Sequence, residues 1–289
     1  MGIDAPMTGD RGPTKRAAVV DRLPRADLAP WHRTLRYVAL RAFLAFAVRA
    51  VVRVRLEGRE RLPAGPAVLC FNHLGWLDPI VLLAVLPLRP RLYLFGPKEA
   101  DMHAGARNRL MTWSGVSVSF KPDRRDLLET TRRVEAVLGV GGQLAVAGEG
   151  RIHVHEDDLM PLQEGTAFFA LRTGVPIVPV AITGTSWVGF GRRVTVRIGA
   201  PIPATGRATR AAVTALTWRT WRSLRAMVDA DRDLEPPGRF GRRLTDLFND
   251  WGPGGRAGAS LERGPDPSGA PSGILSAGSS EPSGAGSEE

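Results

Sequence analysis

The sequence contains the motif Leu69-Cys70-Phe71-Asn72-His73-Leu74-Gly75-Trp76-Leu77-Asp78-Pro79. Both the fold and the chemistry predicted for this chain start from it. It begins inside an apolar run, Ala67 to Phe71, whose composition is typical of a buried strand. A helix is predicted from Pro79 to Leu86, because proline is tolerated in a first turn and a second proline ends the run. The motif therefore occupies a strand-to-helix turn.

His73 and Asp78 are separated by four residues in this turn, so the carboxylate can fold back onto one nitrogen of the imidazole. A carboxylate in that place fixes the tautomer of the ring and raises its basicity. The other nitrogen can then act as a general base on a hydroxyl group. The same spacing also fits a histidine that caps the following helix, so the pair needs support from other motifs.

Strand-like and helix-like segments alternate on both sides of the motif. This alternation predicts an α/β domain with a mixed, mainly parallel central sheet flanked by helices. Further strands are predicted at 53–56, 92–95, 116–118, 144–146 and 175–182, and further helices at 104–113, 126–138, 165–172 and 208–230. The last helix carries Arg219, Arg222 and Arg225 opposite an apolar side. We interpret it as a surface helix, with a membrane-facing or anion-facing role as the alternative.

The length of 289 residues, 43% of them hydrophobic, suits one large domain with appendages. We predict a flexible segment over residues 1–30, a membrane-interface helix over 31–52 and the globular domain over 53–251. Residues 252–289 are rich in Gly, Ser, Pro and Ala and are predicted to be disordered. Residues 1–30 lack the apolar core of a secretory signal peptide.

The helix predicted over residues 31–52 is apolar over a broad arc but carries Arg36, Arg41 and Arg49. An arginine near the middle of a bilayer crossing is costly. The pattern therefore favours an amphipathic helix that lies in the membrane interface with snorkelling arginines. Packing of this helix on the protein's own core is the alternative.

The chain carries 39 Lys and Arg against 29 Asp and Glu, a formal net charge of +10. This charge favours contact with anions such as nucleic acid, anionic lipid headgroups or phosphorylated substrates. A nucleic-acid binder would rest on charge alone, because no nucleic-acid module is recognisable. Cys70 is the single cysteine, which excludes an internal disulfide and fits a reducing compartment. We interpret its thiol as part of the core rather than as a nucleophile.

Two downstream clusters could cooperate with the His73–Asp78 pair. Lys121 follows the apolar run Gly115 to Phe120, where a cation could meet a phosphate at the edge of an α/β sheet. Gly148-Glu149-Gly150-Arg151 follows the predicted strand at 144–146, where glycines let a ligand approach the backbone and Arg151 offers a fork of donors. Taken singly, each cluster also fits a solvated loop or a tight turn.

Together these blocks resemble the four motifs of the glycerolipid acyltransferase family, which includes the 1-acylglycerol-3-phosphate acyltransferases. The blocks are Asn72-His73 with Asp78-Pro79, Gly115 to Lys121, Gly148 to Arg151 and Val175-Pro176-Ile177-Val178-Pro179-Val180. They occur in the family's order and approximate spacing, and four ordered blocks are more specific than any one of them. The resemblance covers about residues 53–203 and implies a glycerol-3-phosphate acyltransferase-like fold.

The resemblance implies that His73 is the catalytic base, that Asp78 orients it, and that an acceptor hydroxyl attacks an acyl thioester of coenzyme A or acyl carrier protein. It assigns substrate binding to Lys121, Glu149, Gly150 and Arg151, and the acyl pocket to Val175, Pro176, Ile177 and Pro179. No metal or other cofactor is implied. The expected partners are the acyl donor, a lysophospholipid acceptor and an anionic membrane surface, at the cytoplasmic face of the cell membrane, with no nucleic acid.

Three departures from the family pattern affect the substrate rather than the base. The usual serine of the first block is Gly75, and the second block ends in Lys121 instead of arginine. The third block usually reads Phe-Pro-Glu-Gly-Thr-Arg, but here Gly148 replaces the proline and no threonine separates Gly150 from Arg151. Acyl transfer is therefore the leading hypothesis, and a non-catalytic lipid-binding relative is the alternative.

The run His153-Val154-His155-Glu156-Asp157-Asp158 holds enough nitrogen and oxygen ligands to raise the question of a metal. It falls in a loop that varies within the family that the chain resembles. A solvated acidic loop is therefore the preferred interpretation, with metal binding as the alternative.

Overall fold

One seven-stranded sheet organises the part of the chain that the computed structural model describes, namely residues 31–98, 105–120, 127–228, 236–249 and 255–261. The strand order is β1-β7-β6-β2-β5-β3-β4, and every neighbouring pair is parallel except the antiparallel pair β6–β7. The strands are β1 (Arg53–Glu57), β2 (Ala67–Phe71), β3 (Leu92–Lys98), β4 (Ser117–Phe120), β5 (Gln143–Ala147), β6 (Ile177–Thr183) and β7 (Arg193–Ile198). The prediction of a mixed, mainly parallel sheet is confirmed.

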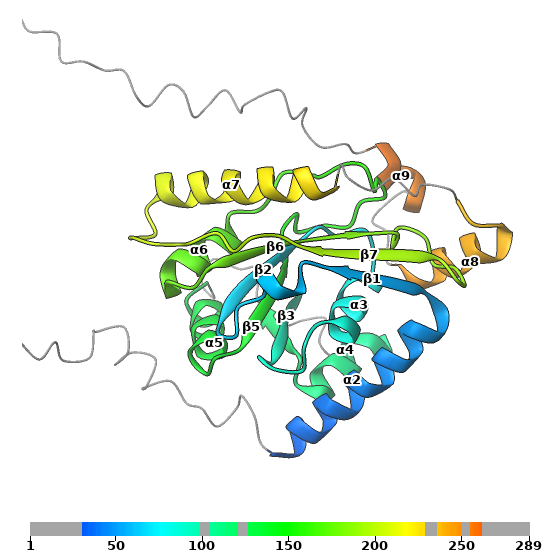
Figure 1. The fold of residues 1–289 in the computed structure, drawn as a ribbon, viewed down its shortest axis with the longest axis horizontal. Coiled ribbons are helices and arrows are strands. Elements are labelled where there is room, and N and C mark those ends of the chain that lie inside the picture. The colour runs from blue at the N-terminus through cyan, green and yellow to red at the C-terminus, as the bar shows by residue number, and fades with distance from the viewer. Residues whose placement is uncertain (1–30, 99–104, 121–126, 229–235, 250–254, 262–289) are drawn as a thin grey trace, which may run out of the picture.

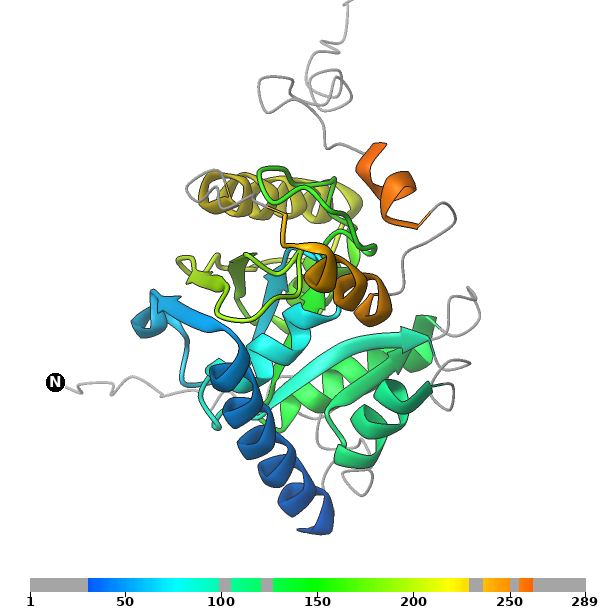
Figure 2. The same ribbon diagram turned by 90° about the vertical axis from the view of Figure 1, so that its right-hand side faces the viewer.

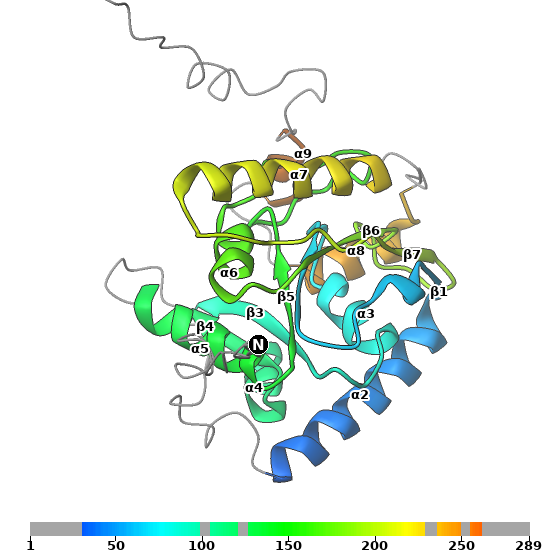
Figure 3. The same ribbon diagram turned by 60° about the vertical axis from the view of Figure 1, so that its left-hand side comes forward.

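Helices cover both faces of the sheet (Figure 1). The helices are α2 (Trp31–Val51), α3 (Leu77–Val85), α4 (Gly105–Ser114), α5 (Leu127–Gly139), α6 (Gly165–Thr173), α7 (Arg210–Val228), α8 (Arg239–Phe248) and α9 (Gly255–Leu261), with a 3-10 turn at Arg59–Arg61. Helices α2, α3 and α4 lie on one face, and α5, α6 and α7 lie on the other (Figure 3). The result is a three-layer arrangement with β2 near its centre.

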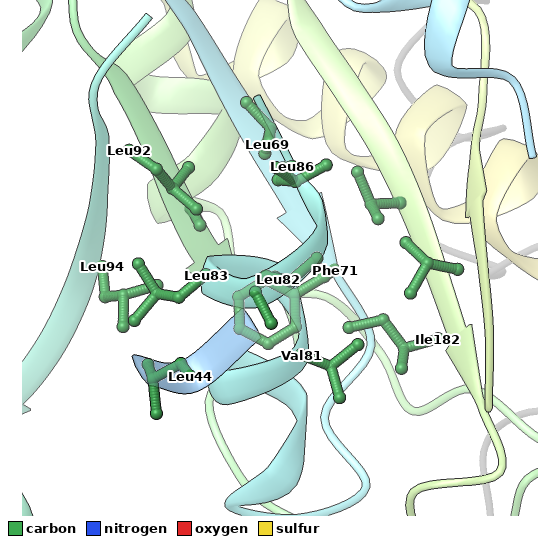
Figure 4. Packing of buried hydrophobic residues seen from close by; sticks show 14 of the residues in the cluster. Leu44, Leu69, Phe71, Val81, Leu82, Leu83, Leu86, Leu92, Leu94 and Ile182 are labelled. Atoms are coloured by element: carbon green, nitrogen blue, oxygen red, sulfur yellow. The ribbon is translucent and has the colours of Figure 1, made fainter. Parts of the chain in front are cut away.

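Strand β2 is buried along its whole length because it has strands on both sides and helices on both faces. Its side chains alternate between two apolar clusters, as the two-residue period of a strand requires. Leu69 and Phe71 face the cluster beneath α3, whereas Val68 and Cys70 face the cluster beneath α6. Figure 4 shows Phe71 beside Leu82 of α3, and Leu69 beside Leu86, which directly follows that helix. Each such buried side chain contributes about 2 kcal/mol to folding.

Three elements were not predicted from the sequence: β7, α8 and α9. The alternation of Val194, Val196 and Ile198 is a strand signal that could have identified β7. The predicted disorder of residues 252–289 is wrong for 255–261, which form α9 and contact the body of the protein. Residues 1–30, predicted to be flexible, lie outside the described residues.

Arg41 of α2 does not snorkel toward a membrane interface as predicted; it points inward and is buried. Its guanidinium donates to the carbonyls of Leu86 and Pro87 and to the Tyr37 hydroxyl, 2.9 Å away. Leu86 is the residue that caps the C-terminal end of α3. A cation there satisfies carbonyls that the helix leaves unpaired and interacts favourably with the helix dipole. Arg41 thus ties α2 to α3.

Replacing Arg41 with alanine is expected to lower the free energy of unfolding by about 2 kcal/mol, because buried carbonyls lose their donor. Arg49→Ala is the matched control, since the exposed Arg49 bonds, among the described residues, only to Ala45 of its own helix, at 3.1 Å. Chemical denaturation of both variants measures the difference. Equal stability of the two variants would contradict a structural role for Arg41.

Candidate active site

The His73–Asp78 pair is formed at the C-terminal end of β2. The imidazole Nδ1 lies 2.9 Å from Asp78 Oδ2, so Nε2 is the ring nitrogen left for a substrate. The same carboxylate oxygen accepts the backbone N–H groups of Leu74, at 2.7 Å, and Gly75, at 2.9 Å. Its other oxygen accepts the hydroxyl of Thr185. Asp78 is fully buried in the first turn of α3, and these donors fix its carboxylate in place.

The backbone of His73 is held by the third sequence block. Its N–H donates to Glu149 Oε1 at 2.8 Å, and its carbonyl accepts the N–H of His153 at 3.0 Å. The second oxygen of Glu149 accepts the N–H of Met160 at 3.0 Å. Only 1% of Glu149 is exposed, and its buried carboxylate fixes the backbone of the His73–Asp78 turn.

Asn72 fixes the spacing between β2 and β6 where the two strands end. Its side-chain amide donates to the carbonyl of Ile182 at 2.8 Å and accepts the N–H of Ile182 at 2.7 Å. These two bonds take the place of backbone hydrogen bonds between β2 and β6 beside His73. The asparagine of the first block therefore has a structural task of its own.

His153 forms a second buried histidine–carboxylate pair beneath the first. Its Nε2 lies 2.8 Å from Glu149 Oε2. Burial by itself lowers the pKa of His153, but the adjoining Glu149 and the charges of Asp158 and Asp78 outweigh burial. The pKa of His153 is therefore raised above its ordinary value.

The loop around Glu156 is buried, so the prediction of a solvated acidic loop is wrong. Glu156 accepts the N–H of Ser186 at 3.0 Å, and it also accepts the Ser186 hydroxyl and the N–H of Gly184. Burial raises its pKa above the ordinary glutamate value. These bonds hold the turn that presents Thr185 to Asp78. Arg225 of α7 closes the loop by donating to the carbonyl of Asp157 at 2.8 Å.

A cavity of about 650 Å³ opens beside His73 at the C-terminal ends of β2, β3 and β5. Ligands of open α/β sheets bind at this edge. Its polar side chains include His73, Trp76, Gln163 and Thr166, and the backbone of Gly150 also lines it. The remaining wall is mostly apolar and includes Phe71, Leu94, Phe95, Met111, Phe120, Ala145, Val146 and Phe169. Such a lining suits a hydrocarbon chain held next to one polar reacting group.

The structure brings together only some of the predicted substrate residues. Gly150 lines the cavity and Arg151 is exposed next to it in sequence, but Glu149 lies behind the cavity wall. Lys121 lies outside the described residues.

The predicted acyl pocket of Val175, Pro176, Ile177 and Pro179 does not line the cavity. Three of these residues are buried, and Ile177 and Val175 belong to the cluster beneath α6 and α7. The prediction is corrected because β6 pairs with β2 on the side away from the cavity, whereas β3 and β5 reach it.

Gly75 replaces the family's usual serine, and Asn249 at the end of α8 explains why. A Cβ atom on Gly75 would lie 2.6 Å from Asn249 Oδ1, closer than real contacts allow. Asn249 Oδ1 instead accepts the N–H of Trp76 at 2.8 Å, within the turn that joins His73 to Asp78. Arg107 adds a second tie, since its guanidinium lies 4.6 Å from the Trp76 ring and donates to the carbonyl of Phe248. No sequence signal identified Asn249.

The described residues contain no group of three His, Cys, Asp or Glu side chains that could hold a metal ion. His153 faces Glu149, whereas the His155 ring contacts the carbonyl of Ser260 at 2.8 Å, so the two rings serve different contacts. Burial raises the pKa of the Cys70 thiol to about 12. A thiol with that pKa is almost entirely protonated at neutral pH, which agrees with a core role for Cys70.

Gly75→Ser is expected to lower the free energy of unfolding by about 1–3 kcal/mol, because the new side chain collides with Asn249. Asn249→Ala in the same chain makes room for the serine, so the double variant should be more stable than the sum of the two single changes predicts. Thermal denaturation of the four proteins measures the coupling. Strict additivity would show that the two residues do not compete for this space.

Stability is expected to fall as the pH rises through the raised pKa of His153. A histidine whose folded pKa exceeds its unfolded value stabilises the protein fully below the unfolded pKa and loses that contribution above the folded pKa. His153→Gln should flatten this part of the profile. Urea denaturation of both proteins between mildly acidic and alkaline pH provides the measurement, and parallel profiles would contradict the assignment.

Comparisons with known proteins agree with this geometry. The model of the protein family described as Acyltransferase matches residues 53–183. A chloroplastic 1-acyl-sn-glycerol-3-phosphate acyltransferase of Arabidopsis thaliana is 24% identical over 158 residues, which cover 54% of this chain and 43% of the relative. A chloroplastic enzyme of the same name from Brassica napus is 24% identical over 157 residues, covering 54% and 44%. The chain thus spans less than half the length of these curated relatives.

The fold also has a solved counterpart. The crystal structure of the 1-acyl-sn-glycerophosphate acyltransferase PlsC from Thermotoga maritima superposes with a TM-score of 0.55 at 19% identity. The superposition covers 67% of this chain and 78% of that chain. The family match includes the His73–Asp78 turn and the Glu149 block, and the solved structure shares the layered sheet around them. Residues 53–183 thus match the model of the Acyltransferase family, and the chain is similar in sequence to 1-acyl-sn-glycerol-3-phosphate acyltransferases and in fold to PlsC.

Proposed function

We propose that this protein transfers a fatty acyl group from a thioester to a hydroxyl of a lysophospholipid such as 1-acylglycerol-3-phosphate. The observation that carries the proposal is the His73–Asp78 dyad, whose histidine lines an apolar cavity of about 650 Å³. The family match and the names of the two plant relatives support the same reaction class.

The proposed chemistry begins with the acceptor hydroxyl next to His73 Nε2. His73 removes the hydroxyl proton while the oxygen attacks the thioester carbonyl carbon, and a new C–O bond forms. The imidazolium produced is stabilised by Asp78 at Nδ1. Collapse of the tetrahedral intermediate breaks the C–S bond, and the departing thiolate takes the proton back from His73. The ester and a free thiol of coenzyme A or acyl carrier protein leave, and no cofactor is consumed.

The apolar wall supports a binding mode for the acyl chain. Phe95 stacks on Phe120 with ring centroids 5.2 Å apart and contacts Phe169 at 5.4 Å, which makes one side of the cavity aromatic. An acyl chain held there would place its carbonyl near His73, in a site that excludes water from the thioester. We assign the phosphate of the acceptor to Arg151 and Lys121, with Gly150 allowing close approach.

Membrane association is part of the proposal. None of the helices in the described part of the chain is both long and apolar enough to cross a bilayer. On α2, however, Leu35, Phe43 and Phe46 are 60%, 63% and 75% exposed, opposite the side that packs on α3 and α4. Exposed apolar residues along one side of a helix suit burial in the interface region of a membrane. We place the protein at the cytoplasmic face of the cell membrane, on an anionic lipid surface.

His73→Ala is expected to lower the rate of acyl transfer at least about 100-fold, because the general base is lost. His155→Ala is the matched control, since His155 does not line the cavity and should keep activity within about twofold of the parent protein. Release of free thiol and extraction of the labelled product lipid measure the reaction with labelled acyl-CoA and a panel of lysolipids.

The alternative, a non-catalytic lipid-binding relative, makes the opposite prediction. The parent protein would then bind lysolipid without releasing thiol above the uncatalysed rate. Unchanged turnover in His73→Ala would instead leave the reaction standing and overturn the assignment of the base.

A further inference from the structure

A second hollow, which we call the arginine groove, lies between the β1–β7 edge of the sheet and the start of α8. Its volume is about 970 Å³. Its lining includes Arg53, Arg193, Arg239, Phe190 and Phe240, and none of the described residues that line it is acidic. The groove is separate from the cavity at His73, with which it shares no lining residue. The proposed acyl-transfer mechanism does not use any residue of the groove.

Two of the arginines lie side by side in the sheet, and neither forms an ion pair with a described residue. Arg53 of β1 and Arg193 of β7 are register partners on neighbouring parallel strands, and both are exposed. Like charges in such positions repel one another and destabilise the pairing. Four residues further along the same two strands, Glu57 and Arg197 are also partners, and they form an ion pair of 2.7 Å. Arg197 is thus neutralised by its strand partner, whereas Arg53 and Arg193 form no ion pair with any residue in the described ranges.

The start of α8 adds further positive potential to the groove. Gly238, the residue before the helix, makes no side-chain cap, so the first N–H groups of α8 carry the positive end of its dipole. Arg239 follows at once and is exposed. Within the described part of the chain, the guanidinium groups of Arg53, Arg193 and Arg239 have no hydrogen-bond or ion-pair partner. Their planar forks match the oxygens of a phosphate group.

Two phenylalanines at the groove favour a lipid as the source of that phosphate. Phe190, in the loop between β6 and β7, is 87% exposed, and Phe240 of α8 is 81% exposed. A soluble phosphate gains nothing from projecting aromatic rings. At a membrane surface, by contrast, such rings enter the boundary between headgroups and acyl chains while arginines contact the phosphates. Figure 2 shows α8 on the side of the molecule that also carries β1 and the end of α2.

We propose that the arginine groove binds the phosphate headgroup of an anionic phospholipid at the membrane surface, with Phe190 and Phe240 inserted among the neighbouring lipids. This site deepens the proposed membrane association and rests on it, but it is independent of acyl transfer. It gives the protein a second attachment point at the C-terminal end of α2. The two points together fix how the domain sits on the bilayer.

The test is sedimentation of the full chain with vesicles of phosphatidylcholine alone or of phosphatidylcholine mixed with phosphatidic acid, without acyl donor. Removing two basic residues at an anionic surface should weaken binding about 30-fold, since each contributes about a factor of five. Arg53→Gln with Arg193→Gln should therefore lose about 30-fold in affinity for the mixed vesicles. Arg219→Gln with Arg222→Gln is the matched control, because these exposed arginines lie on α7, outside the groove. The control should lose less than about threefold.

Three results would overturn the proposal. Equal losses in the two double variants would show a general charge effect, and no loss in the groove variant would show that the groove does not touch the membrane. Phe190→Ser with Phe240→Ser should also weaken vesicle binding. If it does not, and inorganic phosphate raises the Tm of the parent protein but not of the groove variant, the ligand is a soluble phosphate. Thermal denaturation without ligand confirms that each variant is folded.

The same variants separate this proposal from the proposed reaction. With a short-chain lysolipid in detergent micelles, Arg53→Gln with Arg193→Gln should transfer acyl groups at the parent rate, because the groove does not contact the cavity. Absence of acyl transfer in every protein would refute the proposed reaction and leave the vesicle result intact. A parallel loss of soluble turnover and vesicle binding would contradict a separate lipid site.

Discussion

The site depends on the burial of one carboxylate. Asp78 is removed from water completely, which would be costly for an isolated charge. It persists as an acceptor because four donors converge on it: the His73 ring, the N–H groups of Leu74 and Gly75, and the hydroxyl of Thr185. Three of these donors come from the turn itself, whereas the fourth comes from more than 100 residues downstream. The four hydrogen bonds to Asp78 therefore form only when the segment that carries Thr185 has packed against the His73–Asp78 turn.

The parts that brace this carboxylate are themselves buried polar groups. Glu149 holds the backbone of His73, and Glu156 holds the turn that carries Thr185. His153 contacts the first of these through its Nε2, 2.8 Å from Glu149 Oε2. A buried network of this kind is stable only when its members are paired, and then it fixes one geometry. The loop from 153 to 158 thus supports the His73–Asp78 turn, although none of its residues lines the cavity.

The C-terminal helices contribute in a way that local sequence does not reveal. Asn249 fills the space next to Gly75 and accepts the N–H of Trp76, so a departure from the family pattern is matched by a contact from another segment. Arg256 of α9 donates to the carbonyl of Ser186 at 2.8 Å and lies 3.3 Å from the centre of the Trp187 ring. Burial lowers its pKa to about 10. The segment after α7 is thereby part of the structure around the site.

The sequence by itself determined the layered α/β sheet and placed His73 and Asp78 in one turn, because strand and helix periods and short-range spacing are local properties. It could not determine which distant residues meet that turn. Thr185 and Asn249 carry no local signal, and the predicted acyl pocket at Val175 to Pro179 was wrong because its distance from the cavity follows from the strand order. Those contacts follow from the tertiary structure alone, since pairing across the sheet depends on the burial of the whole core rather than on any one segment.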